Sequence, residues 1–438
     1  MKNLKTLLIG LLLCGGAMTG SVFAAPKPNI IVIMADDLGY GDLGCYGHPT
    51  IRTPRLDAMA KAGLKFTDFH SNGAVCSPTR AALLTGRYQQ RSGIGGVVTA
   101  ARHRHTGLAI DEVTFADVLK KNGYATAIYG KWHVGYAPKF NPIHQGFDRF
   151  IGFVSGNVDY HSHIDQVGEI DWWKQDKLVP EEGYTTDLIT AHGVRFIQQN
   201  KDKPFCLYLA HEAPHYPYQG RHDKADRSPG KPKPIKGSRK DKTGAYREMV
   251  EVMDEGIGRI VDAVRAAGIE KRTLIFFCSD NGPSPVGSSG GLRGRKGQVW
   301  EGGHRVPAIA FWPGTIAAGT VTDQTVLTMD LMPTMVAMAG AKLPENLELD
   351  GVNLLPLLQK GNALPERAVG WEFKGNMAYR KGPWKLVRMK RKVFLFHLGK
   401  DRNEKQDLSS SEPERLQTMN AELDAWYRSI TEGVQSRS

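Results

Sequence analysis

Residues able to bind a metal or an anion follow several of the short apolar segments in this sequence. Asp36 and Asp37 come directly after the apolar run 29–34, and Asp280 and Asn281 come after the run 274–278. Carboxylate and carboxamide oxygens are the ligands that a hard divalent cation prefers. A single pair of acids after a strand is more often a turn or a helix cap. Two such blocks at predicted strand ends favour a divalent metal site.

A cysteine and an arginine lie at a predicted helix start. The segment Cys76-Ser-Pro-Thr-Arg80 is followed by Ala-Ala-Leu-Leu-Thr-Gly-Arg87. Proline near the first turn is typical of a helix N-terminus. There, the backbone N–H groups and the positive end of the helix favour a bound anion. We therefore expect an anion beside residue 76.

Three further segments carry lysine and histidine beside glycine or proline. They are Gly130-Lys131-Trp132-His133-Val134-Gly135, Ala213-Pro214-His215-Tyr216-Pro217, and Leu292-Arg-Gly-Arg-Lys296 with Glu301-Gly-Gly-His-Arg-Val-Pro307 behind it. Alone, a buried histidine is usually a structural residue and a lysine near glycine is usually a surface charge.

Together, these segments resemble the signature blocks of the formylglycine-dependent (type I) sulfatases of the alkaline-phosphatase-like superfamily. Within that family, the overall similarity points to the arylsulfatase A and galactose or N-acetylgalactosamine 6-sulfatase group. The resemblance extends over nearly the whole chain after the first residues. It implies hydrolysis of a sulfate ester, a Ca²⁺ ion, and conversion of Cys76 to 3-oxoalanine (formylglycine) by a sulfatase-maturing enzyme that reads Cys-X-Pro-X-Arg.

The resemblance also implies a role for each matching residue. The expected metal ligands are Asp36, Asp37, residue Cys76, Asp280 and Asn281. The expected catalytic residues are Cys76, Arg80, Lys131, His133, His215 and Lys296. Lys131 and Lys296 hold sulfate oxygens, His215 with Lys296 protonates the leaving alcohol, and His133 accepts a proton in the step that releases sulfate. Ser155 fits a sulfate-contacting position with a one-residue gap. Candidates for a sugar-binding rim, for which structural roles are equally expected, are His161, His163, His211 and Arg293.

The charge of the chain agrees with an anionic substrate. Its 438 residues include 57 Lys and Arg against 45 Asp and Glu, a formal net charge of +12. Such a balance favours a polyanionic partner. The sequence has no zinc-finger spacing, no RNA-binding signature and no heptad-linked basic region. We therefore expect a sulfated carbohydrate, and no nucleic acid, as the partner.

The first 24 residues are typical of a secretory signal peptide. Lys2 and Lys5 precede a short apolar run, and the segment ends in Val22-Phe23-Ala24. The run is too short to span a bilayer, so we expect periplasmic or extracellular export without a stable membrane anchor. Cys45, Cys76, Cys206 and Cys278 then remain, widely spaced and without the pattern of a disulfide framework. Cys206 and Cys278 are expected as buried thiols, and one pairing of Cys45 stays open.

The surrounding pattern predicts an α/β fold. Apolar, strand-like runs at 29–34, 125–129, 205–210, 274–278 and 308–312 alternate with helix-like segments at 55–62, 114–121 and 246–267. Such alternation predicts a mostly parallel or mixed sheet covered by helices on both faces, with functional residues just beyond the strand ends. The resemblance implies the same architecture, an alkaline-phosphatase-like mixed central sheet flanked by helices.

Two further regions complete the predicted organisation. Residues 221–242 form a basic surface loop that is either a solvated excursion or a mobile rim for an anionic substrate. We assign residues 25–355 to a catalytic domain and residues 356–438 to a small α+β subdomain. In that subdomain, strands are expected near 378–379, 384–388 and 393–397, before a helix at 413–430.

Three other functions remain to be compared with hydrolysis of a carbohydrate sulfate. A general arylsulfatase would share the residues named above. A formylglycine-dependent phosphate or phosphonate monoester hydrolase belongs to the same superfamily, but lysines and histidines at every expected sulfate position favour the sulfatase. A polyanion-binding protein without catalysis would account for the charge, but not for Asp280-Asn281 or the Cys76 segment.

Overall fold

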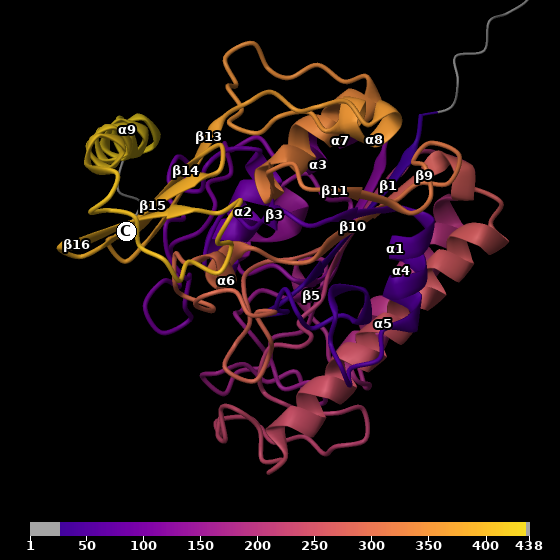
Figure 1. Ribbon diagram of the computed structural model, residues 1–438. Coiled ribbons are helices and arrows are strands. Elements are labelled where there is room, and N and C mark those ends of the chain that lie inside the picture. Colours follow the sequence, from indigo (N-terminus) through magenta and orange to yellow (C-terminus); the bar gives the residue numbers. More distant parts are fainter. Residues whose placement is uncertain (1–26, 435–438) are drawn as a thin grey trace, which may run out of the picture.

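A ten-stranded mixed sheet forms the centre of the protein (Figure 1). The computed structural model describes residues 27–434, so the predicted signal peptide lies outside the described residues. The strand order is β11-β2-β10-β9-β1-β8-β4-β5-β6-β7. β1 lies in the middle and runs parallel to both neighbours, β8 and β9. The predicted α/β architecture is confirmed.

The secondary-structure elements have the following bounds. The strands are β1 (Asn29–Ala35), β2 (Leu64–Phe66), β3 (Phe69–His70), β4 (Ala125–Lys131), β5 (Arg149–Phe153), β6 (Trp173–Lys174), β7 (Lys177–Leu178), β8 (Phe205–Ala210), β9 (Thr273–Ser279), β10 (Ala308–Phe311), β11 (Thr320–Thr322), β12 (Val326–Leu327), β13 (Ala368–Phe373), β14 (Asn376–Lys381), β15 (Trp384–Met389) and β16 (Lys392–His397). The α-helices are α1 (Pro54–Ala62), α2 (Cys76–Thr85), α3 (Phe115–Lys121), α4 (Thr185–Asn200), α5 (Lys242–Ala266), α6 (Glu301–His304), α7 (Leu331–Ala339), α8 (Leu355–Lys360) and α9 (Pro413–Thr431).

Both faces of the central sheet are buried. In β1, Ile30 and Val32 belong to one apolar core, and Ile31 and Ile33 belong to the other. Helices α1, α4 and α5 cover one face, while α2, α3 and α7 cover the opposite one (Figure 1). A strand buried on both faces needs apolar residues at every position. This explains the unbroken apolar runs in the sequence.

The carboxyl ends of the central strands deliver the polar residues to one edge of the sheet. Asp36 and Asp37 follow β1, and Asp280 follows β9, which lies beside β1. β4 continues two residues beyond its predicted end, so Lys131 is the last residue of the strand. α5 also begins earlier than predicted, at Lys242, because the Asp241 side chain accepts a hydrogen bond from the Gly244 N–H and caps the helix.

The C-terminal residues form a separate four-stranded antiparallel sheet, β13-β14-β15-β16, with α9 packed on one side (Figure 1). The predicted strands and final helix are present, and β13 was missed by sequence reasoning. The proposed border at residue 356 falls inside α8. Leu357 and Leu358 of that helix are buried in the core of the main sheet, while the C-terminal sheet itself starts at Ala368.

A buried lysine joins this C-terminal sheet to the main domain. Lys385 on β15 is fully buried, and its Nζ lies 2.8 Å from Glu301 Oε1 and 2.9 Å from Glu404 Oε1. The same ammonium donates to His304 Nε2 at 3.1 Å. His304 Nδ1 in turn lies 2.9 Å from His70 Nδ1. Because ammonium donates only, His304 accepts at Nε2 and donates from Nδ1 to His70.

Glu404 also holds both ends of a loop that carries a predicted catalytic lysine. Its backbone carbonyl accepts from Arg293 Nη1 at 2.9 Å, and its carboxylate accepts from the Glu301 N–H at 2.7 Å. Lys296 lies between these two points in the chain. The connection between β16 and α9, which contains Glu404, therefore fixes the base of the loop 293–301.

We predict that Lys385→Met lowers the free energy of unfolding by about 3–5 kcal/mol, because it leaves Glu301 and Glu404 buried without their cation. Urea unfolding followed by circular dichroism measures the change. The matched control is Lys381→Met on β14, since the Lys381–Glu422 pair has a lysine side chain that is 55% exposed. The control is expected to cost less than about 1 kcal/mol. Equal losses in the two variants would contradict the prediction.

Candidate active site

A cavity of about 330 Å³ opens beyond the carboxyl ends of the central strands. Five of the predicted site residues line it: Cys76, His133, Ser155, His215 and Lys296. The remaining wall comes from the segments 97–101, 156–157 and 165–167 and from Tyr136 and Tyr216. The cavity size suits a small ligand or one end of a larger one.

Acidic oxygens form the floor beside this cavity. Asp36, Asp37, Asp280 and Asn281 are all fully buried. The Asp37 N–H donates to Asp280 Oδ1 at 3.2 Å, and Asn281 Nδ2 donates to Asp37 Oδ1 at 2.8 Å. Ligand atoms of Asp36, Asp37, Cys76 and His215 lie within 4.8 Å of one another. The two acidic blocks of the sequence thus meet at a single point.

Each of the three carboxylates has a cation of its own. The Lys131 ammonium contacts Asp36 Oδ2, Arg80 Nη2 lies 2.9 Å from Asp280 Oδ2, and Lys296 Nζ lies 2.6 Å from Asp37 Oδ1. Lys131 and Arg80 are completely enclosed, whereas the Lys296 side chain is 23% exposed. Lys296 is therefore the cation that an incoming ligand can reach.

The donor set fits a hard divalent cation. Burial, and next the charge of Asp36, raise the pKa of Asp280 to about 7, as expected where carboxylates lie close together away from solvent. Asp37 Oδ2 and Asn281 Oδ1 are buried and have no hydrogen-bond partner among the described residues. Unpaired buried oxygens are costly unless they bind a cation. These atoms are therefore available as metal ligands.

Cys76 is the first residue of α2 and is 2% exposed. Its Sγ lies 3.2 Å from Asp36 Oδ1 and 3.4 Å from Lys296 Nζ. Burial, followed by the charges of Asp280 and Asp36, raises the pKa of the thiol well above its ordinary value. The unmodified side chain is a protonated thiol at neutral pH, and a protonated thiol is a weak nucleophile.

Two histidines present an unprotonated nitrogen to the site. His133 Nε2 donates to the Val98 carbonyl at 2.9 Å, and His133 Nδ1 is buried without a partner among the described residues. His215 Nδ1 donates to the Tyr216 carbonyl at 2.6 Å, and His215 Nε2 lies 3.7 Å from Asp37 Oδ2. Burial, and next the charge of Lys296, lower the pKa of His215 to about 4. Burial and Lys131 lower the pKa of His133 still further.

Ser155 lies in the cavity wall, and the four predicted rim residues do not. Ser155 Oγ donates to the Asn157 carbonyl at 3.0 Å. His161 Nε2 is 3.1 Å from the Gly220 carbonyl, His163 stacks on Trp172, and His211 is fully buried. Arg293 stacks on Trp300, with 3.7 Å between its guanidinium carbon and the ring centroid.

Sequence reasoning missed the loop residues of the cavity wall. The segment 97–101, Asn157 and the segment 165–167 come from connections without a strand-end or signature pattern. Tyr136 and Tyr216 are the exceptions, because Tyr136 directly follows the segment 130–135 and Tyr216 directly follows His215. The tertiary fold alone brings the other segments to the cavity.

Comparison with known proteins agrees with this geometry. The family profile described as Sulfatase matches residues 28–341, and a profile for the C-terminal region of N-sulphoglucosamine sulphohydrolase matches residues 295–425. Human arylsulfatase A is 38% identical over 407 residues, covering 84% of this chain and 76% of the relative. N-acetylgalactosamine-6-sulfatase of Rattus norvegicus is 36% identical over 389 residues, covering 83% of this chain and 71% of the relative.

A solved structure is similar along nearly the whole chain. The crystal structure of Ps i-CgsB in complex with k-i-k-neocarrahexaose superposes with a TM-score of 0.84 at 32% sequence identity, covering 94% of each chain. The expected family and its alkaline-phosphatase-like fold are thereby confirmed. This chain belongs to the sulfatase family and is a sulfuric ester hydrolase.

Proposed function

We propose that this protein is an exported, calcium-dependent sulfatase that removes sulfate from a sulfated polysaccharide or its oligosaccharides, with formylglycine at position 76. The observation that carries the proposal is the environment of Cys76. Its side chain lies at a helix N-terminus, between the acidic floor and Lys296, at the inner end of the cavity. A nucleophile is expected at this place, yet the thiol there is protonated.

Conversion of Cys76 to an aldehyde resolves this conflict. In hydrated form, the aldehyde supplies one hydroxyl to attack sulfur and a second whose deprotonation lets sulfate leave. Asp36 Oδ1 and Lys296 Nζ, which contact Sγ in this structure, are positioned to orient those hydroxyls. The α2 N-terminus adds favourable charge for an anion at the same point.

Calcium is the proposed metal because its ligands here are oxygens. Asp36, Asp37, Asp280 and Asn281 would hold it, together with the modified residue 76. When bound, the ion would stabilise negative charge on the sulfate group. The Asp37 and Asn281 oxygens that lack hydrogen-bond partners support this assignment.

In our proposal, the lysines supply positive charge and the histidines transfer protons. Burial opposes the charge of Lys296, but Asp37 and Asp36 hold the pKa of Lys296 well above its ordinary value, so Lys296 remains an ammonium that attracts the sulfate. Lys131 and Arg80 neutralise the buried carboxylates of Asp36 and Asp280, respectively. His133 Nδ1 accepts a proton when sulfate leaves. Because His215 Nε2 is unprotonated, the proton for the leaving alcohol would come from the Lys296 ammonium and would be transferred by His215.

The substrate is proposed from charge and from the relatives. The net charge of +12 favours a polyanion, and the similar Ps i-CgsB structure contains k-i-k-neocarrahexaose. A panel of defined sulfated sugars, with free sulfate as the readout, tests the sugar and the sulfated position. A comparison of aryl sulfate with aryl phosphate tests the phosphate ester alternative.

Export is proposed from residues 1–24, which lie outside the described residues. Between residues 27 and 434, no helix has the length and apolar character needed to cross a membrane. Active protein is therefore expected in the periplasmic or extracellular fraction of the producing cell.

We predict that active enzyme carries an aldehyde at residue 76. Mass analysis of the peptide containing Cys76 is expected to show an oxygen in place of the thiol and one hydrogen. Cys76→Ala is expected to reduce turnover by at least about 10³-fold, while Cys45→Ser, on a partly exposed cysteine, retains activity. Fully active protein with only cysteine at position 76 would rule out this chemistry.

We predict that removal of the metal reduces turnover to about 1% or less, and that added Ca²⁺ restores it. Asp280→Asn is expected to lower both bound calcium and activity, because it removes one anionic ligand. Asp323→Asn, at an exposed acid, is the control. Metal content by mass spectrometry and sulfate release are measured on the same samples. Undiminished activity in metal-free enzyme would refute the assignment.

We predict that His215→Ala slows desulfation of a sugar sulfate by roughly 10²–10⁴-fold, because a poorly acidic alcohol needs a proton in the transition state. An activated aryl sulfate should lose less than about tenfold in the same step. His133→Ala should instead slow sulfate release from both substrates. Single-turnover kinetics separate the two steps. An equal first-step loss with both substrates would assign His215 to binding.

A further inference from the structure

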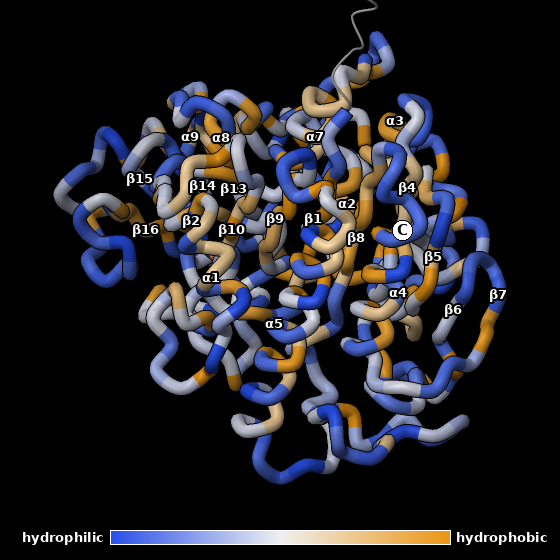
Figure 2. The backbone as a smooth tube through the Cα atoms, turned by 90° about the vertical axis from the view of Figure 1, so that its right-hand side faces the viewer, coloured by the Kyte–Doolittle hydropathy of each residue, from blue (hydrophilic) through white to orange (hydrophobic). Residues whose placement is uncertain are grey.

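A second and larger cavity, of about 730 Å³, lies between α4 and the edge of the main sheet formed by β4, β5 and β6. We call it the α4 groove. Four cationic residues line it: Arg149, Lys174, Arg195 and Lys203. None of the catalytic or metal-binding residues lines the α4 groove. Figure 2 shows α4 beside these strands, with hydrophilic segments around β6 and β7 at the sheet edge.

Strands β4, β5 and β6 form one side of the groove, and their register shows which residues share that surface. Tyr129 on β4 is paired with Ile151 on β5, and Ile151 is paired with Lys174 on β6. Arg149 lies two residues before Ile151, so its side chain points to the same face. Three neighbouring strands therefore present these residues on one surface.

Helix α4 supplies the opposite side. His192, Arg195 and Phe196 lie three and four residues apart, so they share one face of the helix. Phe196 and His192 are buried against the sheet, while Arg195 remains exposed at the rim. Lys203 follows the helix and adds a cation at its C-terminal end. The cations thus stand around an apolar floor.

The positive charge of the groove is not neutralised by protein. Within residues 27–434, no ion pair joins Arg149, Lys174, Arg195 or Lys203 to an acid. The one acid in the lining, Asp148, already pairs with Lys120 at 2.9 Å. The groove therefore offers free cations to an anionic ligand.

A tyrosine hydroxyl lies in the same groove as these cations. Tyr129 is 6% exposed, and its hydroxyl makes no hydrogen bond within the described part of the chain. Burial raises the pKa of Tyr129 to about 12, and the positive charges of Arg149 and Arg195 oppose that rise. Tyr129 lines the same groove as Arg149 and Arg195, so its neutral hydroxyl is free to donate a hydrogen bond to an anion bound there.

We propose that the α4 groove is a noncatalytic binding site for a sulfated polysaccharide, separate from the active site. The proposal rests on the proposed substrate class. The lining of the groove shares no residue with the lining of the cavity that contains Cys76 and Lys296, so the groove does not contact the ester being hydrolysed. A sulfated polymer that is held at a second site stays at high local concentration near the enzyme.

The floor of the groove argues against nucleic acid as the occupant. Single-stranded nucleic acids bind by stacking bases on exposed aromatic rings as well as by charge. Tyr129, His192 and Phe196 are 6%, 7% and 4% exposed, so the groove offers little aromatic surface for stacking. Exposed cations around a shallow floor suit sulfate groups along a flexible chain.

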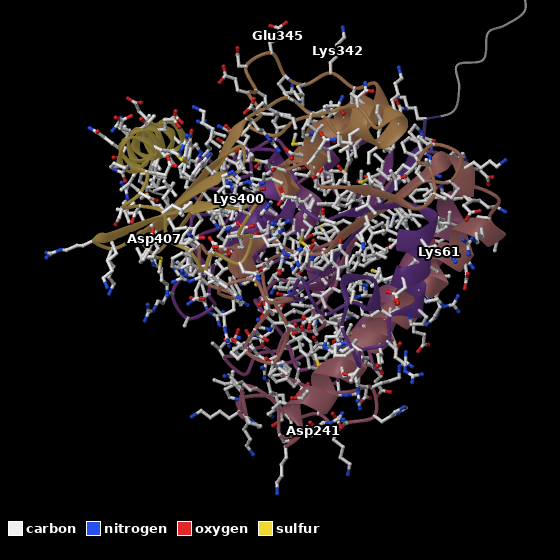
Figure 3. All side chains as sticks on the ribbon, viewed as in Figure 1. Lys61, Asp241, Lys342, Glu345, Lys400 and Asp407 are labelled. Atoms are coloured by element: carbon white, nitrogen blue, oxygen red, sulfur yellow. The ribbon has the colours of Figure 1, made fainter. Side chains whose placement is uncertain are left out.

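The test compares two double charge reversals in the full-length mature enzyme. Arg149→Glu/Arg195→Glu changes the groove. Lys61→Glu/Lys342→Glu makes the same change in net charge at exposed lysines elsewhere on the surface (Figure 3). Affinity for dextran sulfate is measured by isothermal titration calorimetry, with unsulfated dextran and single-stranded DNA as comparison ligands. Turnover of a small aryl sulfate is measured for every variant.

The groove variant is expected to bind dextran sulfate about tenfold more weakly at low ionic strength, with a smaller difference at high salt. The control is expected to change less than about twofold, and aryl sulfate turnover should stay unchanged in both. Equal weakening in the two variants, or wild-type binding by the groove variant, would overturn the proposal. Groove-dependent binding of single-stranded DNA as tight as that of dextran sulfate would also overturn it.

The binding measurement does not depend on catalysis. A protein that binds dextran sulfate through the groove, but releases sulfate from no sugar, would refute the proposed substrate and leave the groove assignment intact. Sulfate release from sulfated polysaccharide with identical Michaelis constants in wild type and groove variant would refute the groove and leave the proposed function intact.

Discussion

Three carboxylates buried side by side impose the main physical constraint on this protein. Asp36, Asp37 and Asp280 repel one another in a site without solvent, and such a cluster is stable only where positive charge surrounds it. Arg80, Lys131 and Lys296 provide that charge from three distant parts of the chain. The parallel strands, the buried helix α2 and the loop 293–301 are all needed to bring these cations together.

The C-terminal sheet takes part in the same arrangement although it contributes no residue to the cavity lining. Lys385 and Glu404 fix the base of the loop that carries Lys296, through a buried network that also includes His304 and His70. Lys296 is thus held from a neighbouring layer of the protein. The C-terminal sheet and the main domain therefore share a charged interface, in which Lys385 pairs with Glu301 and Glu404.

The central part of the site was predictable because its residues follow strands or begin a helix. Asp36, Asp280 and Cys76 occupy such positions, and apolar runs reveal strands that are buried on both faces. The cavity wall was not predictable, since segments such as 97–101 and 165–167 have no periodic pattern. The histidines and arginine expected at the rim failed to reach it because hydrogen bonds or stacking engage three of them elsewhere, and His211 is buried in the interior. Helix α4 was also missed, because polar residues interrupt its apolar face.

The burial of α2 has a consequence for the order of events in biosynthesis. All ten residues from Cys76 to Thr85 are buried, including the Cys-X-Pro-X-Arg segment that a maturing enzyme would have to read. A second protein cannot bind this segment once α2 has packed against the central sheet and the C-terminal layer. The oxidation of Cys76 that we propose would therefore take place on the nascent or unfolded chain. Protein that folds in a cell without the maturing enzyme would keep its thiol, and later contact with that enzyme would not convert it.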